Sequence, residues 1–237
     1  MSTGGPGLEA QEIGQDAGSG RQQPDGAPRA LTQKGTLTRG RLLAAAKEIF
    51  EEDGLLDARI SDITAQAHVS QGTFYTYFTS KQEIFREVAL RVDEELGAPL
   101  GAVILDRSST ATPRERIREA IRLYLERYRQ EARIMGVIEQ VSRHDPLLGA
   151  ERAARHDRER RLVAESISRL QRRGFVDDSL DPLITAAVLS SMTNRFPELW
   201  LSEERLDCSF DEGVEHLTVI FINALQITNP DETEQVR

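Results

Sequence analysis

Residues 70–78 read Ser-Gln-Gly-Thr-Phe-Tyr-Thr-Tyr-Phe, and they have the pattern of a short helix with one apolar face. Taken as a helix at about 100° per residue, it places Phe74 and Phe78 on one face, where both rings can anchor it in a core. The opposite face holds Gly72 and Thr76, which are small. A glycine in so short a helix costs about 0.5–1 kcal/mol relative to alanine, so we expect it to serve the close approach of another group.

The beginning of this stretch suits contact with nucleic acid. A helix N-terminus offers unpaired N–H groups, and here it is accompanied by Gln71, two threonines and flanking tyrosines. Such groups bind phosphates and hydrogen-bond to base edges in a major groove. Lys81 stands in the first turn of the next predicted helix, where a cation opposes the helix dipole, so we expect it to contact a phosphate instead.

Helical signals on both sides of the stretch predict two short helices flanked by longer ones. Apolar residues recur at helical spacing over 42–50, and Gly54 follows as a stop signal. A short helix is predicted over 60–67, and Ser80 can cap a longer helix that follows residue 80. Two short helices joined by a tight turn are the layout of a helix-turn-helix unit.

Basic residues surround the start of the first long helix, which we expect near Thr36, with Thr36 or Thr38 as its cap. No acid lies between the first and the last of these cations. They are Lys34, Arg39, Arg41 and Lys47. This local basic patch can face DNA phosphates, or it can be the solvated end of a helix.

The composition of the chain limits its class. Among 237 residues, 30 basic and 39 acidic ones give a net charge of −9, which excludes a protein that coats nucleic acid through bulk positive charge but not a local DNA-reading surface. The single Cys208 excludes an internal disulfide framework and fits a reducing compartment. No stretch approaches the ~18 apolar residues of a membrane span, and no signal pattern opens the chain. We expect a soluble cytoplasmic protein with no cofactor or metal.

The chain divides into four parts on composition and pattern. Residues 1–33 hold seven glycines and three prolines but few bulky aliphatics, so we expect a disordered tail. A helix-turn-helix domain with its connecting helix follows over 34–96. A larger helical domain covers 97–228, and 229–237 form a C-terminal tail. No strand pair is recognisable, so the sequence predicts an all-α protein.

The larger domain shows five helical patterns, separated by proline, glycine or polar residues. They cover 113–130, 132–142, 146–173, 181–200 and 210–227. Pro197 should kink or end its helix. Arginines are frequent over 152–173, but acids precede bases by four residues, as in Glu165 and Arg169, so we interpret this helix as solvated rather than as a second nucleic-acid site.

These motifs resemble the DNA-binding region of TetR-family transcriptional regulators. The resemblance covers about 55 residues, 37–91, without gaps. Gly54 and the segments 60–64, 67–78 and 80–83 carry it. It implies a homodimer with two helix-turn-helix heads that read a near-palindromic operator in double-stranded DNA. The helical bodies would bind a small inducer, and the last two helices of each chain would form the dimer.

The resemblance also implies a role for individual residues. Phosphate contacts at the first two helices would come from Thr38, Arg41 and Ser61. The groove would receive Ser70, Gln71, Gly72, Thr73 and Thr76. The DNA backbone would be gripped by Tyr75, Tyr77 and Lys81. Two positions depart from the family: His68 stands at the turn position usually held by glycine, where histidine tolerates a left-handed backbone, and Gln71 stands where a basic residue is sometimes found.

Large side chains of the larger domain are the candidate lining of a ligand pocket, with ordinary core as the alternative for each. They are Tyr124, Tyr128, Met135, Ile138, Met192, Phe196 and Trp200. Such a pocket would take an apolar ligand with few polar groups. Because we find no nucleotide-binding loop, catalytic triad or carboxylate pair, we do not expect an enzyme. We expect a ligand-responsive repressor, or alternatively a helical ligand- or partner-binding dimer that does not bind an operator.

Overall fold

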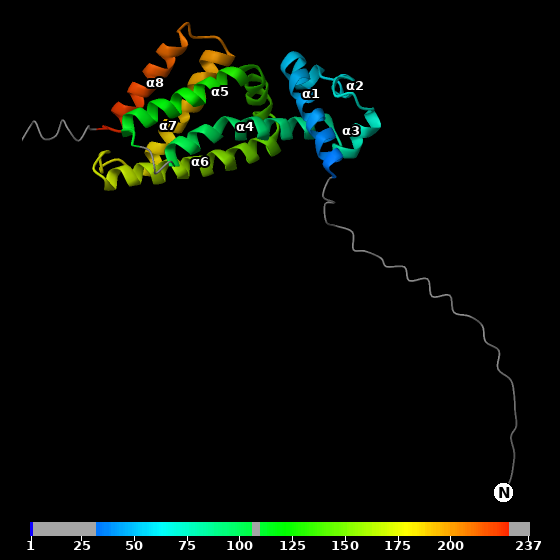
Figure 1. Ribbon diagram of the computed structural model, residues 1–237, viewed down its shortest axis with the longest axis horizontal. Coiled ribbons are helices and arrows are strands. Elements are labelled where there is room, and N and C mark those ends of the chain that lie inside the picture. The colour runs from blue at the N-terminus through cyan, green and yellow to red at the C-terminus, as the bar shows by residue number, and fades with distance from the viewer. Residues whose placement is uncertain (2–31, 106–109, 228–237) are drawn as a thin grey trace, which may run out of the picture.

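The computed structural model describes residues 1, 32–105 and 110–227, with 98–105 described by their backbone alone. Its described part contains helices and no strand, which confirms the all-α prediction (Figure 1). The first four helices are α1 (Gln33–Asp57), α2 (Ile60–Gln66), α3 (Gln71–Tyr77) and α4 (Lys81–Leu105). The others are α5 (Pro113–Ser142), α6 (Pro146–Arg172), α7 (Pro182–Pro197), the π-helical turn η1 (Glu198–Ser202) and α8 (Phe210–Ala224). The predicted tails, 1–33 and 229–237, lie outside the described residues apart from Met1, Thr32 and Gln33.

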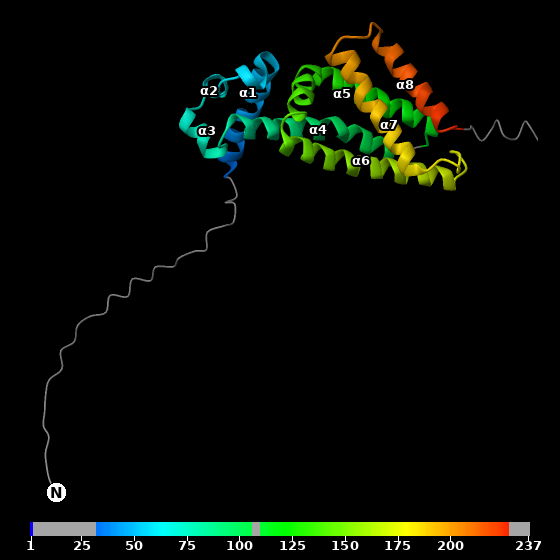
Figure 2. The same ribbon diagram turned by 180° about the vertical axis from the view of Figure 1, so that it is seen from behind.

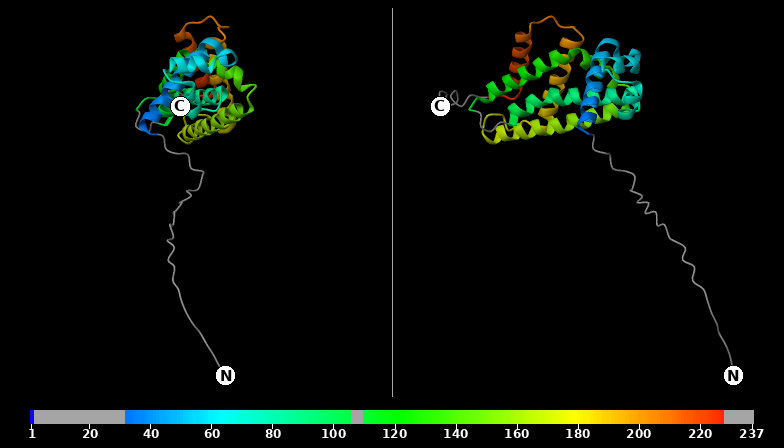
Figure 3. Two further views of the ribbon diagram at one scale, coloured as in Figure 1. Left: turned by 90° about the vertical axis from the view of Figure 1, so that its right-hand side faces the viewer. Right: turned by 45° about the vertical axis from the view of Figure 1, so that its right-hand side comes forward.

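Two groups of helices share the long α4. Figures 1 and 2 show α1, α2 and α3 gathered around the beginning of α4, while α5–α8 surround its later part. We call α1–α3 with the beginning of α4 the head, and the remaining helices the body. The right-hand view of Figure 3 shows the same division. Because α4 belongs to both groups, a displacement of α4 in the body moves the head as well.

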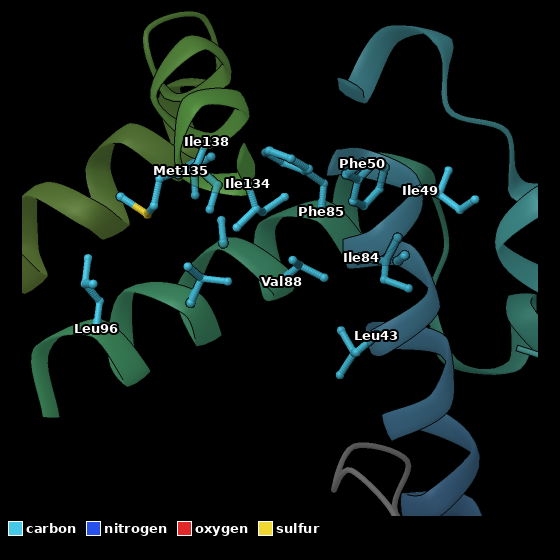
Figure 4. Packing of buried hydrophobic residues seen from close by; sticks show 14 of the residues in the cluster. Leu43, Ile49, Phe50, Ile84, Phe85, Val88, Leu96, Ile134, Met135 and Ile138 are labelled. Carbon is cyan, nitrogen blue, oxygen red and sulfur yellow. The ribbon is translucent and has the colours of Figure 1, made fainter. Parts of the chain in front are cut away.

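One hydrophobic core runs from the head into the body along α4. Figure 4 shows Phe50 of α1 against Phe85 of α4, with Ile134 and Ile138 of α5 on the body side. The rings of Phe50 and Phe85 meet edge to face, with centroids 5.0 Å apart. All four side chains are buried. Burial of such side chains is worth about 1.5–3 kcal/mol each, so the head and the body are stabilised together.

The first helix begins earlier than the sequence indicated. Its cap is Thr32, whose hydroxyl accepts a hydrogen bond from the Gly35 N–H at 3.2 Å. The hydroxyls of Thr36 and Thr38 instead donate to carbonyls four residues earlier, so neither residue caps the helix. Gly54, the predicted stop signal, interrupts α1 rather than ending it: its φ of 72° is not helical and is one that glycine adopts without strain, and the helix resumes up to Asp57.

The predicted break between 130 and 132 does not exist. Helix α5 continues through Glu131, because no residue at this point lacks an N–H or favours a turn. The carboxylate of Glu131 pairs with Lys47 of α1 at 2.8 Å, so it ties the head to the body rather than ending a helix. At its start, Thr112 and Glu115 form a capping box.

Pro197 changes the helix in which it lies, as expected. Helix α7 ends there, and the chain continues as η1 up to Ser202. Proline lacks an N–H and its ring crowds the preceding turn, which accounts for the wider π-helical turn. This turn places the Trp200 ring on Gly213 of α8, where a Cβ atom would lie only 2.5 Å from the ring.

Candidate nucleic-acid interface and ligand cavity

The turn between α2 and α3 has the geometry that the sequence predicted. His68 adopts a left-handed backbone with a φ of 53°, which confirms the expectation for the position where glycine is usual. The N–H of Val69 then donates to the Thr64 carbonyl at 3.0 Å. Ser70 caps α3, because its hydroxyl accepts from the Thr73 N–H at 3.1 Å. The direction of α3 is therefore set by backbone hydrogen bonds at its entrance.

The inward face of α3 is anchored by two phenylalanines. Phe74 and Phe78 are fully buried, as predicted, and their ring centroids lie 5.7 Å apart. The guanidinium of Arg39 lies 5.2 Å from the Phe78 ring centroid and also pairs with Glu87 of α4. This contact fixes the end of α3 against α1 and α4.

The outward face of α3 is bare. Gln71, Gly72 and Thr76 are exposed, and Tyr75 is 57 % exposed. A Cβ atom at Gly72 would meet only the Ser70 hydroxyl, at 3.7 Å, so the described part of the chain leaves the space above it open. A narrow polar ridge of this kind fits between the walls of a DNA major groove.

The other predicted DNA contacts lie in the head as well, but they differ in how exposed their side chains are and in whether they already have partners. Arg41 and Ser61 are exposed, whereas Thr38 and Tyr77 are half-buried. Lys81 has a role that the sequence did not suggest: its ammonium donates to the carbonyls of Leu56 and Ala58, at 2.8 and 2.6 Å. It thereby holds the turn after α1.

The basic patch at the start of α1 separates into two pairs of residues. Lys34 and Arg41 are exposed, which suits contact with phosphates. Arg39 is engaged by Glu87, and Lys47 by Glu51 and Glu131. Although burial acts to lower it, these two carboxylates raise the pKa of the Lys47 ammonium above its usual value. Half of the patch therefore stabilises the fold instead of facing solvent.

A cavity of about 1350 Å³ lies in the body, lined by residues from α4 to α8. Three of the seven predicted lining residues contribute to it: Tyr124, Tyr128 and Met135. The other four, Ile138, Met192, Phe196 and Trp200, are absent from its lining. Ile138 is fully buried in the core, and Trp200 stacks between Phe196 and Phe210 at centroid distances of 5.4 and 6.0 Å. For Trp200 the turn after Pro197 is the reason, because it directs this ring toward α8.

The cavity wall contains buried charges that sequence reasoning missed. Arg152 of α6 is 5 % exposed, and it binds Asp93 of α4 at 2.8 Å and Glu139 of α5 at 2.7 Å. Its guanidinium thus joins three helices. The sequence spacing could have indicated that Arg152 is buried, because it follows the apolar Leu148 by four residues and therefore lies on the same, inward face of the helix.

The two cavity tyrosines remain neutral. Burial raises the pKa of the Tyr128 hydroxyl to about 12, and it raises the pKa of Tyr124 well above the usual value. The Tyr128 hydroxyl accepts a hydrogen bond from Ser202 at 3.4 Å. Both phenols therefore offer neutral polar groups on an otherwise largely apolar wall.

Within residues 1, 32–97 and 110–227, no group of three or more histidine, cysteine or acidic side chains could hold a metal ion. No helix in the described part is both long and apolar enough to cross a membrane.

Comparisons with known proteins identify the head. The family model described as "Bacterial regulatory proteins, tetR family" matches residues 42–88. The HTH-type transcriptional regulator YdgC of Bacillus subtilis is 43 % identical over 58 residues, which are 24 % of this chain and 30 % of that protein. The chain thus spans under a third of that relative. UidR, an HTH-type transcriptional regulator of Escherichia coli, is 26 % identical over 156 residues, 66 % of this chain and 78 % of UidR.

Solved structures share the fold over both head and body. A TetR-family regulator from Mesorhizobium loti superposes with a TM-score of 0.70 at 20 % identity, covering 82 % of this chain and 98 % of that one. GusR of Salmonella enterica gives a TM-score of 0.66 at 18 % identity, covering 83 % and 98 %. The relatives are transcriptional regulators, so the expectation that the chain is not an enzyme is confirmed. Residues 42–88 therefore match the helix-turn-helix DNA-binding region of TetR-family transcriptional regulators, and the fold of the described chain is the one that solved members of that family share.

Proposed function

We propose that the chain is a ligand-responsive repressor that binds a near-palindromic operator as a homodimer and leaves it when a small inducer, largely apolar, occupies the body. Residues 34–96 would read the DNA, and 97–228 would bind the inducer and dimerise. The observation that carries this proposal is the bare polar ridge of α3 above its two buried phenylalanines. A homodimer lets two such ridges enter successive major grooves, about 34–36 Å apart.

The roles at the DNA follow from the exposed side chains. Gln71 can form two hydrogen bonds to an adenine edge, and Gly72 lets the backbone come close to the bases. Hydroxyl contacts in the groove would come from Ser70, Thr73 and Thr76. Contacts to phosphates and to the DNA backbone would come from Thr38, Arg41, Ser61, Tyr75, Tyr77 and Lys81. Because phosphate contacts release counterions, the affinity would depend on salt.

The proposed dimer uses apolar side chains that the monomer leaves in water. Helix α7 exposes Leu183, Ile184 and Val188, at 56, 67 and 55 %. Helix α8 exposes Val219 and Ile220, at 37 and 48 %. An exposed apolar stripe on each of two helices favours burial against a second copy, and a two-fold axis would bring the same stripes together.

Coupling between ligand and operator would run through α4. Asp93 and Leu96 of α4 line the cavity, while Phe85 of the same helix packs in the head core. A ligand that prefers one position of α4 would therefore change the distance between the two heads. It would weaken operator binding by the ratio of its affinities for the two states.

The experiment is a fluorescence-anisotropy titration of the full chain with DNA fragments from upstream of its own gene. We expect one fragment to bind tightly and its affinity to fall steeply from low to moderate salt. An affinity that stays flat over that range would contradict phosphate contacts by Arg41, Tyr77 and Lys81.

The second candidate function is a helical dimer that binds a ligand or partner without an operator. The net charge of −9 and the neutral Gln71 favour it. It would be supported if no fragment bound above the level of random DNA while the chain remained dimeric. Sedimentation of the same sample gives the oligomeric state.

A further inference from the structure

The cavity differs in charge from the rest of the molecule. The chain as a whole carries a net charge of −9. Among the described residues that line the cavity, seven are arginines and four carry carboxylates. Most of these arginines belong to α6, the helix that the sequence indicated as solvated. An excess of cations around a cavity favours an anionic occupant.

Three of the four lining carboxylates are already engaged. Asp93 and Glu139 both bind Arg152, and Glu159 binds Arg155 at 2.9 Å. These pairs also pack closely against α4, because a Cβ atom at Gly97 would lie 2.9 Å from the Arg155–Glu159 pair. Arg160 binds Asp157, which leaves Arg158 and Arg169 as the lining arginines of α6 that no carboxylate of the described residues pairs with.

Arg169 is a half-buried cation of the cavity wall without a carboxylate partner among the described residues. The pair with Glu165 that the sequence suggested is not formed. Within the described part of the chain, its one hydrogen bond goes to the neutral Ser166 hydroxyl, at 2.6 Å. A guanidinium has five N–H donors in a planar fork that matches a carboxylate, so most of the donors of Arg169 are left for a ligand.

The helix dipole does not account for this placement. Cations are favourable in the last turn of a helix, and both Arg169 and Arg172 stand there in α6. Arg172 has this favourable position at the helix end although its side chain is exposed and does not line the cavity, so the position alone does not require a cation to face the cavity. Arg169 and the next lining cation, Arg173, turn toward the cavity, and the Arg173 guanidinium lies 4.9 Å from the centroid of the Phe175 ring.

The walls contributed by the other helices suit an apolar body. Ile117 and Ile121 come from α5, Leu189 from α7, and Phe221 from α8. Tyr124, also on α5, is 5 % exposed, and its hydroxyl forms no hydrogen bond with a residue that the structure describes. It therefore offers a ligand one neutral polar contact.

The charges around Tyr124 set the orientation of a ligand. Three carboxylates, Asp93, Glu139 and Glu159, act on its hydroxyl and add to the effect of burial in raising its pKa. These three carboxylates outnumber Arg152 and Arg155, the two arginines that pair with them, so an acid group is disfavoured there. Arg169 lies on α6 ten residues beyond Glu159, about 15 Å along the helix. The acid end of a ligand would therefore point toward the end of α6 and away from Arg152.

We propose that the cavity binds an organic acid whose carboxylate pairs with Arg169, with Arg173 close by, and whose apolar body lies between α5, α7 and α8. This inference rests on the proposed function, because it names the chemical class of the inducer. It changes the expectation of a largely apolar inducer in one respect, since the apolar body carries a single anionic group.

The test uses matched compounds on two skeletons: octanoic acid, octanamide and octylamine, and 4-phenylbutyric acid with its amide and amine. Binding to the full chain is measured by isothermal titration calorimetry and by thermal shift. We expect at least one acid to raise the melting temperature and to bind at least tenfold more tightly than its amide. Equal binding by the amide, stronger binding by the amine, or no binding by either acid would overturn the proposal.

Variants locate the acid contact. Arg169→Gln should abolish the preference for acid over amide, and Arg169→Lys should keep part of it because the charge remains. Arg172→Gln removes a cation from the same helix end without touching the cavity, so it should bind the acids as the unchanged chain does. An unchanged preference in Arg169→Gln, with its helical circular-dichroism melt intact, would overturn the assignment to Arg169. An equal loss in Arg172→Gln would also overturn it.

Operator binding is followed separately, so that the two proposals can fail independently. If acids bind through Arg169 but leave the protein–DNA complex unchanged, the acid site stands and the ligand-responsive repressor does not. If neutral compounds release the DNA while acids do not bind, the repressor stands and the acid site does not.

Discussion

The head and the body of this molecule place their functional groups in different ways. In the head, nine consecutive residues supply both the buried anchors of α3 and its exposed ridge, and Ser70 orients them through the Thr73 N–H. In the body, the cavity is assembled from five helices, and Arg152 meets an acid that lies 59 positions away in the sequence. The function of the head is therefore local, whereas that of the body depends on how distant helices pack.

The largest expected effect concerns the buried charges of the body. Arg152→Ala leaves Asp93, whose side chain is 4 % exposed, without its cation. Removing one partner of a buried pair costs about 3–5 kcal/mol, so we expect a loss of that size in the free energy of unfolding, measured by urea denaturation. Asp93→Asn combined with Arg152→Met should lose clearly less. A loss below about 1 kcal/mol in Arg152→Ala would show that water reaches this pair.

The same contrast explains what the sequence could predict. His68 was identified correctly because a left-handed backbone is a local requirement with few acceptable residues, and Gly54 was recognised as a point where the helix is interrupted, although α1 continues to Asp57. The division of the helix between 130 and 132 was wrong: the chain is helical through Glu131, whose partner Lys47 comes from a distant helix that the local pattern could not reveal. The direction of Trp200 could not be inferred either, since it follows from the π-helical turn after Pro197 and from the space that Gly213 leaves.

The body also depends on one glycine that no local turn requires. A Cβ atom at Gly213 would overlap the Trp200 ring, so Gly213→Ala should displace that ring and separate α8 from η1. Overpacking of this kind costs about 1–3 kcal/mol. Trp200 fluorescence during chemical denaturation would report both the lower stability and the altered environment of the ring. An unchanged emission maximum together with an unchanged midpoint would contradict this packing.

The matching glycine of the head should behave in the opposite way. Gly72→Ala meets open space, so the free protein should keep its stability or gain up to about 1 kcal/mol from the better helix former. The new methyl group stands on the ridge that would enter the groove. We expect operator affinity to fall at least tenfold, about 1.4 kcal/mol. Thermal unfolding and anisotropy on the same sample separate the two effects, and an unchanged affinity would mean that this ridge does not approach the bases.

The smallest effect tests whether the head reads sequence or only shape. Gln71 is exposed and carries no charge, so its removal leaves the phosphate contacts in place. Gln71→Ala should therefore reduce overall affinity by less than about threefold, while discrimination at one base pair of each half-site falls by about 1 kcal/mol, the low end for an amide–adenine pair. Binding to a set of operators that differ at single positions measures both quantities. If the variant were weakened equally on every operator, Gln71 would act on the DNA backbone, and the sequence specificity of the head would have to come from its hydroxyl groups and from DNA shape.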